Sequence, residues 1–177
     1  VGLALYTAQR NTCAFKNHFI TFSNNPYLCE VKGQTIKEKV NNIPCYIENT
    51  DIDKAFELIL RTMKENNLRQ EELPSHLLII SDMEFDTGVY SKGGTNLEGW
   101  KQAFNDEGYK LPIIIFWNVA GRTNGVPATK FDNDVAMVSG FSTNILENLL
   151  TLENYTPNNV MLEKLSIYLE MFKTNNK

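Results

Sequence analysis

The chain has 177 residues and a formal net charge of −4, with 42% hydrophobic, 21% charged and 11% aromatic residues. This length suits one domain with a substantial core, and the mixed charges argue against broad electrostatic capture of nucleic acid. No apolar stretch approaches the roughly 20 residues that a membrane-spanning helix needs.

The first part of the chain is predicted to hold a helix, a hairpin and a second helix. The opening residues, VGLALYTAQRN, have a helical pattern. HFITFSNNP alternates and ends in turn residues, which predicts a strand at 19–22; YLCEVKG predicts a second strand after the turn. QTIKEKVNNI then predicts a short helix, and PCYIENTD an extended loop.

The middle of the chain alternates amphipathic helices with apolar strands. Asp51 or Asp53 opens a helix through KAFELILRTMKENN, whose apolar stripe is typical of one buried face. LLIISD (77–82) and LPIIIFWNV (111–119) are continuous apolar runs, typical of strands that are buried on both faces of a parallel sheet. TNLEGWKQAFNDEGY, between them, predicts a helix that stops near Gly108.

The last part of the chain is predicted to add one strand and two helices. VAMVSGF predicts the strand, and STNILENLLTLE and TPNNVMLEKLSIYLEMFK predict the helices. Helices thus alternate with buried strands along the whole chain. We therefore expect an α/β fold with a doubly wound, mostly parallel sheet, helices on both faces and a hairpin at one edge.

The cysteines indicate a reducing environment. Cys13, Cys29 and Cys45 are an odd number of thiols without CxxC spacing, so reduced cysteines in a cytoplasmic protein are expected. Together with His18 and His76 they offer too few suitably spaced ligands for a zinc site.

Oxygen-bearing side chains gather at the predicted carboxyl ends of the strands, where open α/β sheets bind ligands. Ser23, Asp82 and Asn118 stand at three of these ends, and Glu84 and Asp86 add two carboxylates just after Asp82. A donor set of hydroxyls, amides and carboxylates suits Mg²⁺, Mn²⁺ or Ca²⁺ better than zinc. The alternative for SDMEFD is a turn whose carboxylates are solvated.

Several strings resemble, in this order, one family: FITFSNNP, ENTDIDKAFELIL, LLIISDMEFD, LPIIIFWNVAGR and VAMVSGFSTNILE. It is a little-characterised von Willebrand factor A-like (vWA-like) family of plants, microbes and large DNA viruses. A more distant similarity is to the vWA half of Ro-type ring ribonucleoproteins. The resemblance implies a metal-ion-dependent adhesion site, in which Thr50 would supply a hydroxyl and Asp82 would hold the ion through water.

The sequence departs from the family at one motif. The family's Asp-x-Ser-x-Ser motif is absent from this sequence, and the family places it just before the helix that matches VGLALYTAQRN. The resemblance therefore implies that 1–177 is a single vWA-like domain whose first, central strand would lie upstream of residue 1. Without that strand, the metal site would lack about half of its ligands.

The resemblance favours a non-enzymatic interaction module, whose ion captures a carboxylate of a protein partner. Two alternatives stay open. One is a Mg²⁺-dependent phosphoryl-transfer or nuclease enzyme that uses Asp82 and Asp86, although GxGxxG and GxxxxGK[ST] loops are absent. The other is an RNA-associated module of Ro type, which the acidic net charge does not support.

Overall fold

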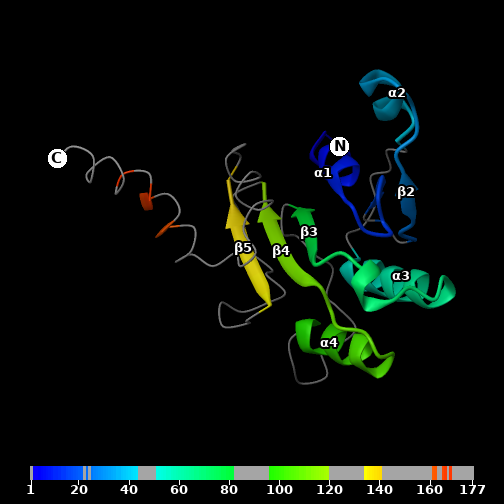
Figure 1. The fold of residues 1–177 in the computed structure, drawn as a ribbon, viewed down its shortest axis with the longest axis vertical. Coiled ribbons are helices and arrows are strands. Elements are labelled where there is room, and N and C mark those ends of the chain that lie inside the picture. The colour runs from blue at the N-terminus through cyan, green and yellow to red at the C-terminus, as the bar shows by residue number, and fades with distance from the viewer. Residues whose placement is uncertain are drawn as a thin grey trace.

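The computed structural model describes residues 2–21, 23, 25–43, 51–81, 96–119 and 134–140, with five helical residues between 161 and 168. Its helices are α1 (Gly2–Arg10), α2 (Ile36–Asn41), α3 (Ile52–Glu65) and α4 (Asn96–Asp106), with a 3₁₀ turn η1 (Gln70–Glu72). Its strands are β1 (His18–Ile20), β2 (Leu28–Glu30), β3 (His76–Ser81), β4 (Ile113–Asn118) and β5 (Val135–Ser139) (Figure 1). Within these residues, no helix is long and apolar enough to cross a bilayer.

The described strands form two sheets. β3, β4 and β5 run parallel with β4 in the centre, whereas β1 and β2 pair as an antiparallel hairpin. The α/β class, the parallel sheet and the hairpin are thus confirmed. The hairpin was expected at the edge of the same sheet, but no described strand connects it by hydrogen bonds to β3, β4 or β5.

The main core lies between the parallel sheet and the helices α3 and α4. Asp51 caps α3, because its side chain accepts a hydrogen bond from the backbone N–H of Lys54 at 3.1 Å. The predicted apolar stripe of α3 is buried except for the half-buried Leu60, so this prediction is confirmed. Buried residues that join helices and sheet in this cluster include Phe56, Ile59, Met63, Leu97, Trp100, Phe104, Ile79, Ile114 and Phe116.

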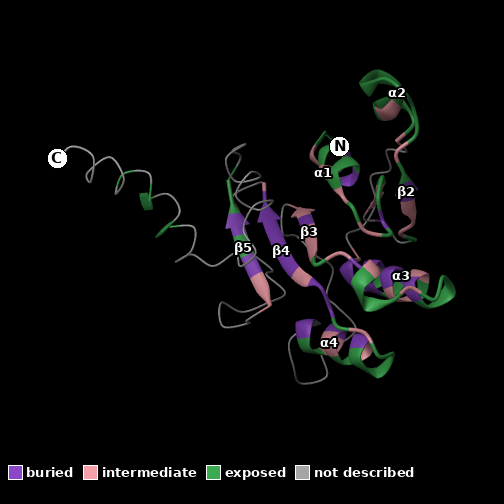
Figure 2. Ribbon diagram, in the orientation of Figure 1, coloured by how far each residue is buried: buried purple, intermediate pink, exposed green. Residues whose placement is uncertain are grey.

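The opposite face of the parallel sheet carries a smaller apolar cluster. Ile115, Trp117, Ala136 and Val138 are buried there, with Leu3 of α1 packed against them. Because successive side chains of a strand point to opposite faces, β4 contributes to both clusters. The prediction of a strand buried on both faces is confirmed for β4 (Figure 2).

The same prediction is wrong for β3. Only Ile79 of this strand is buried, and its other residues, Leu77, Leu78 and Ile80 among them, are half-buried (Figure 2). The physical reason is position in the sheet. β3 has one hydrogen-bonded neighbour among the described strands, whereas β4 has two.

Element boundaries differ slightly from those predicted. The strand expected at 19–22 is β1 and begins at His18, and it ends at Ile20. The helix before Gly108 ends at Asp106, and Gly108 has a φ of 80°, a left-handed conformation that favours glycine. The loop expected over PCYIENTD falls mainly outside the described residues, as do most of the two C-terminal helices.

Candidate functional site

The last residues of the three parallel strands form a polar row. Ser81 of β3 pairs with Asn118 of β4, and Asn118 pairs with Ser139 of β5. The preceding row on the same face consists of Ile79, Phe116 and Met137, because side chains alternate between faces. The face that packs against α3 and α4 therefore changes from apolar to polar at the carboxyl edge of the sheet.

Backbone and indole hydrogen bonds hold this edge together. The N–H of Val119 donates to the carbonyl of Ser81 at 3.1 Å, and the N–H of Gly140 donates to the carbonyl of Asn118 at 3.1 Å. The Trp117 indole N–H then donates to the carbonyl of Gly140 at 2.7 Å. Gly140 has a φ of 114°, which favours glycine at this turn. Asn118 is itself buried, whereas Ser139 and Gly140 are exposed.

Of the predicted site residues, the structure describes two. Asn118 ends β4 in the parallel sheet, and the buried Ser23 follows β1 in the hairpin, so they come from different sheets. Thr50, Asp82, Glu84 and Asp86 lie outside the described residues. Described residues nevertheless lie next to Thr50 and Asp82 in the sequence. The residue after Thr50 caps α3, and β3 ends immediately before Asp82.

The side-chain oxygen atoms of the polar row are suitable ligands for a hard cation. Ser81, Asn118 and Ser139 offer hydroxyl and amide oxygens, which Mg²⁺ and Ca²⁺ accept as ligands. The polar row itself contains no carboxylate, and the described residues contain no group of three or more His, Cys, Asp or Glu placed to hold a metal ion. Asp82, next to Ser81, is the nearest carboxylate in sequence.

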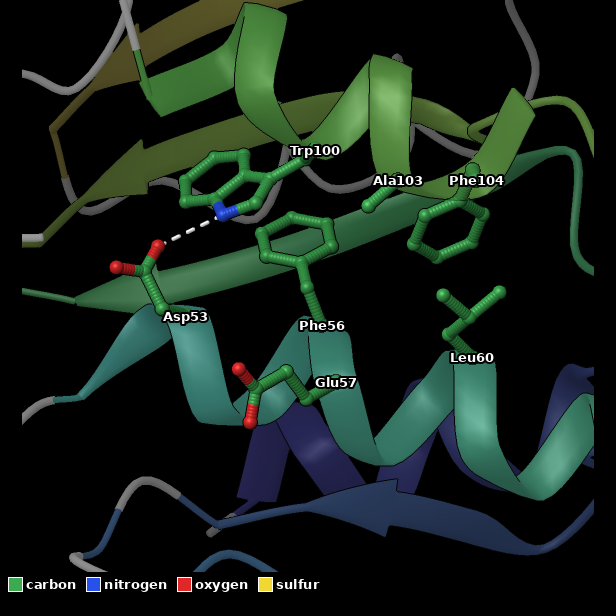
Figure 3. Close-up of a pocket in the computed structure, with 7 residues that line it drawn as sticks. All are labelled: Asp53, Phe56, Glu57, Leu60, Trp100, Ala103 and Phe104. Carbon is green, nitrogen blue, oxygen red and sulfur yellow. Dashed lines mark hydrogen bonds between the residues drawn. The ribbon is translucent and has the colours of Figure 1, made fainter. Parts of the chain in front are cut away.

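Sequence reasoning missed a buried carboxylate in the first turn of α3. Asp53 accepts a hydrogen bond from the Trp100 indole N–H at 2.7 Å, and both side chains are buried. Beside them, α3 and α4 enclose a hollow of ≈ 30 Å³ (Figure 3). That is room for water but not for an organic ligand. A signal was present in the sequence, because Asp53 shares a helix face with the apolar Phe56 and Leu60.

A family model described as "Domain of unknown function (DUF7788)" matches residues 1–173. The chain belongs to the DUF7788 family. "Uncharacterized protein L728" of Acanthamoeba polyphaga mimivirus is 25% identical over 175 residues, which are 96% of this chain and 30% of the viral protein. The DUF7788 chain thus spans 30% of the length of this relative. No solved structure matches the DUF7788 chain.

His76 of the DUF7788 chain lies at the opposite end of β3 from the polar row. It is the first residue of the strand, and its Nδ1 is 2.9 Å from the Ser75 hydroxyl oxygen. Its Nε2 is buried and has no hydrogen-bond partner among the described residues. Burial lowers the pKa of His76 below its usual value of 6.5. His76 is thus a half-buried residue at the entrance of β3.

The DUF7788 chain is therefore expected to lose stability as the pH falls below the ordinary pKa of histidine. The unfolded chain binds a proton at His76 near pH 6.5, whereas the folded chain binds it only at lower pH, so protonation favours unfolding. The midpoint of urea unfolding should be lower at pH 5.5 than at pH 7.5. His76→Gln should flatten this dependence, because ordinary carboxylates titrate below this range. An unchanged pH dependence in His76→Gln would contradict the assignment.

Proposed function

We propose that this chain is a vWA-like interaction module without catalytic activity. It binds a divalent cation, Mg²⁺ or Mn²⁺ in the first place, at the carboxyl edge of the parallel sheet. The bound ion captures a carboxylate of a protein partner. One observation carries the proposal: β3, β4 and β5 end in register in a polar row, and Asp82 is the next residue after that row.

The roles of the individual residues follow from their places in the chain. Asp82, the residue after the end of β3, holds the ion, directly or through water. Thr50 supplies a hydroxyl just before the cap of α3. Ser23 and Asn118 line the rim, and Glu84 and Asp86 add negative charge next to the site. One coordination position of the ion stays open to the partner's carboxylate.

We further propose that the two sheets belong to one doubly wound vWA-like sheet, completed by a strand between β1 and β3. In Figure 1 the hairpin lies beyond β3, on the side away from β5. Thr21, at the end of β1, has a buried hydroxyl without a described hydrogen-bond partner. The apolar β3 is only half-buried. Unpaired apolar strand edges are unfavourable, and a strand from upstream of residue 1 would pair them, as the resemblance implies.

Backbone amide exchange tests this arrangement. In the full-length natural protein, the amides of β3 should exchange as slowly as those of the central β4. Fast exchange along β3 together with slow exchange along β4 would contradict a strand on the side of β3 that faces away from β4.

We also propose a cytoplasmic location, which fits the free thiols of Cys13 and Cys29.

Metal titration tests the function itself. The full-length protein should bind Mn²⁺ in isothermal titration calorimetry, and Asp82→Ala should weaken this binding at least about tenfold. Asp106→Ala is the matched control, because Asp106 is an exposed aspartate of α4 that accepts a hydrogen bond from Gln102. Its affinity for Mn²⁺ should be that of the wild type.

The same samples separate the alternatives. Mn²⁺ binding without hydrolysis of a phosphodiester such as bis-p-nitrophenyl phosphate supports the interaction module. Metal-dependent hydrolysis that is lost in Asp82→Ala would replace it with the phosphoryl-transfer or nuclease enzyme. Tight binding of single-stranded RNA that does not depend on Asp82 would favour the RNA-associated module. A wild-type protein that binds no divalent metal overturns the proposal.

A further inference from the structure

The short helix α2 is ordered by local hydrogen bonds, although it buries no side chain. The Thr35 hydroxyl oxygen accepts a hydrogen bond from the backbone N–H of Glu38 at 3.2 Å. The Glu38 carboxylate accepts in return from the backbone N–H groups of Gln34 at 2.8 Å and Thr35 at 3.4 Å, which completes a capping box. These hydrogen bonds hold the pKa of Glu38 below its usual value. The first turn of α2 is therefore held without contacts to the core.

The chain on both sides of α2 is tied to the end of the hairpin. The Asn42 side-chain amide, just after the helix, donates to the carbonyl of Lys32 at 3.0 Å. Before the helix, Gly33 has a φ of 130°, and a Cβ there would lie 2.8 Å from the Cβ of Glu38. Glycine is the residue that allows this close approach. α2 therefore projects from the hairpin in a defined position (Figure 1).

α2 presents its apolar face to solvent. Ile36 is 80% exposed and Val40 is 43% exposed, and the two side chains lie one turn apart on the same face (Figure 2). Single exposed aliphatic residues are common, but the apolar face of a helix normally packs against its own domain. Of α1 to α4, only α2 has no buried residue. This aliphatic pair is therefore open to a partner outside the described part of the chain.

Two lysines flank the aliphatic pair. At about 100° per residue, Lys37 and Lys39 lie on opposite sides of it, each roughly 60° from the nearer aliphatic residue. Neither lysine forms an ion pair with a described residue. The acidic residue between them, Glu38, directs its carboxylate to the backbone N–H groups of the cap. This face is therefore positive, in a chain whose net charge is −4.

We propose that this face of α2, with Ile36 and Val40 between Lys37 and Lys39, docks an acidic segment of another protein. An aliphatic side chain of that segment covers Ile36 and Val40, and carboxylates beside it pair with the two lysines. Because α2 is already ordered, binding does not require the helix to fold. The contact involves no metal ion, so it is independent of the proposed metal site.

An anionic membrane carries the same sign of charge, but it matches α2 less well. Helices that lie on membranes bury a long apolar face, whereas α2 has 6 residues and a single aliphatic pair. Two lysines attract an anionic surface only weakly, and the net charge of −4 opposes that attraction. The observations therefore favour a protein segment.

Nuclear magnetic resonance of the full-length protein with two synthetic peptides tests the docking surface. The acidic peptide is a short helix with leucines one turn apart between glutamates, and the control peptide has lysines in place of the glutamates. With EDTA present, the acidic peptide should shift the amide signals of residues 34–42, and the control peptide should not. Ile36→Ser/Val40→Ser should weaken binding of the acidic peptide at least about tenfold. Both residues are exposed, so this variant should keep its stability.

A pair of charge variants tests the role of the lysines. Lys37→Gln/Lys39→Gln should weaken binding of the acidic peptide about threefold or more, and high salt should do the same in the wild type. Arg61→Gln/Lys110→Gln is the matched control, because it removes two exposed positive charges from α3 and from the chain before β4. Its affinity for the acidic peptide should be that of the wild type.

Shifts in residues 34–42 that are lost in both α2 variants and kept in the control variant support the docking surface. It is overturned if the acidic peptide at about 1 mM shifts no amide of α2, if both peptides bind equally, or if either α2 variant binds like the wild type. If vesicles of phosphatidylcholine and phosphatidylserine sediment the wild type but not Ile36→Ser/Val40→Ser, a membrane replaces the protein segment. Every one of these measurements is made without Mn²⁺, so the docking surface and the proposed function can fail separately.

Discussion

Replacing Phe116 by alanine is expected to lower the free energy of unfolding by about 3–5 kcal/mol. Phe116 is 0% exposed in β4, on the face that packs against α3 and α4. Loss of the ring removes apolar burial and leaves a cavity. β4 is paired on both sides, with β3 and with β5, so the strand cannot move to fill that cavity. Urea denaturation followed by circular dichroism measures the difference.

Met137→Ala provides the control for Phe116→Ala. Met137 is the register partner of Phe116 in β5 and lies on the same face, but it is 44% exposed. Its replacement should cost less than about 1 kcal/mol, because little apolar area leaves contact with the protein. Equal losses in the two variants would contradict the packing of α3 and α4 over β4.

The sequence predicts strand identity better than strand burial, as β3 and β4 show. Both are continuous apolar runs, and both were expected to be buried on two faces. The runs correctly predict two parallel strands. Their burial depends on which strands lie beside them, and this is a property of the whole sheet that a single run does not encode. β3, with one described neighbour, therefore departs from the prediction while β4 follows it.

In the candidate site, too, the sequence predicts where a residue lies along a strand but not which distant residue it contacts. Asn118 could be placed at the carboxyl edge because it comes at the end of an apolar run that predicts a strand. The carboxyl ends of parallel strands lie at the same edge of a sheet. The hydrogen bond between Asp53 and Trp100 joins residues 47 positions apart, and no local pattern predicts such a pairing. Locally, Asp53 shares a helix face with Phe56 and Leu60, but an acidic residue in the first turn of a helix is also commonly solvated. Its burial depends on how α4 packs against α3.

Trp117 tests the other face of the same strand, and Trp117→Ala is expected to cost about 3–5 kcal/mol. The side chain is 1% exposed in the cluster with Ile115 and Val138. If Phe116→Ala and Trp117→Ala are both severely destabilising, β4 is a central strand with a core on each side. A small loss for Trp117→Ala alone would mean that this second face is weakly packed.

Trp117→Phe isolates the hydrogen bond at the candidate edge. Phenylalanine keeps an aromatic ring in the cluster but leaves the Gly140 carbonyl without the indole N–H that it accepts at 2.7 Å. The expected loss is about 0.5–1.5 kcal/mol, the net contribution of one hydrogen bond, because Gly140 is exposed and water can reach its carbonyl. Because Gly140 also donates its N–H to Asn118, the turn after β5 and the polar row should loosen together. Faster amide exchange at Gly140 and Val119 in Trp117→Phe would show this, whereas wild-type stability and exchange would mean that the indole does not hold the edge.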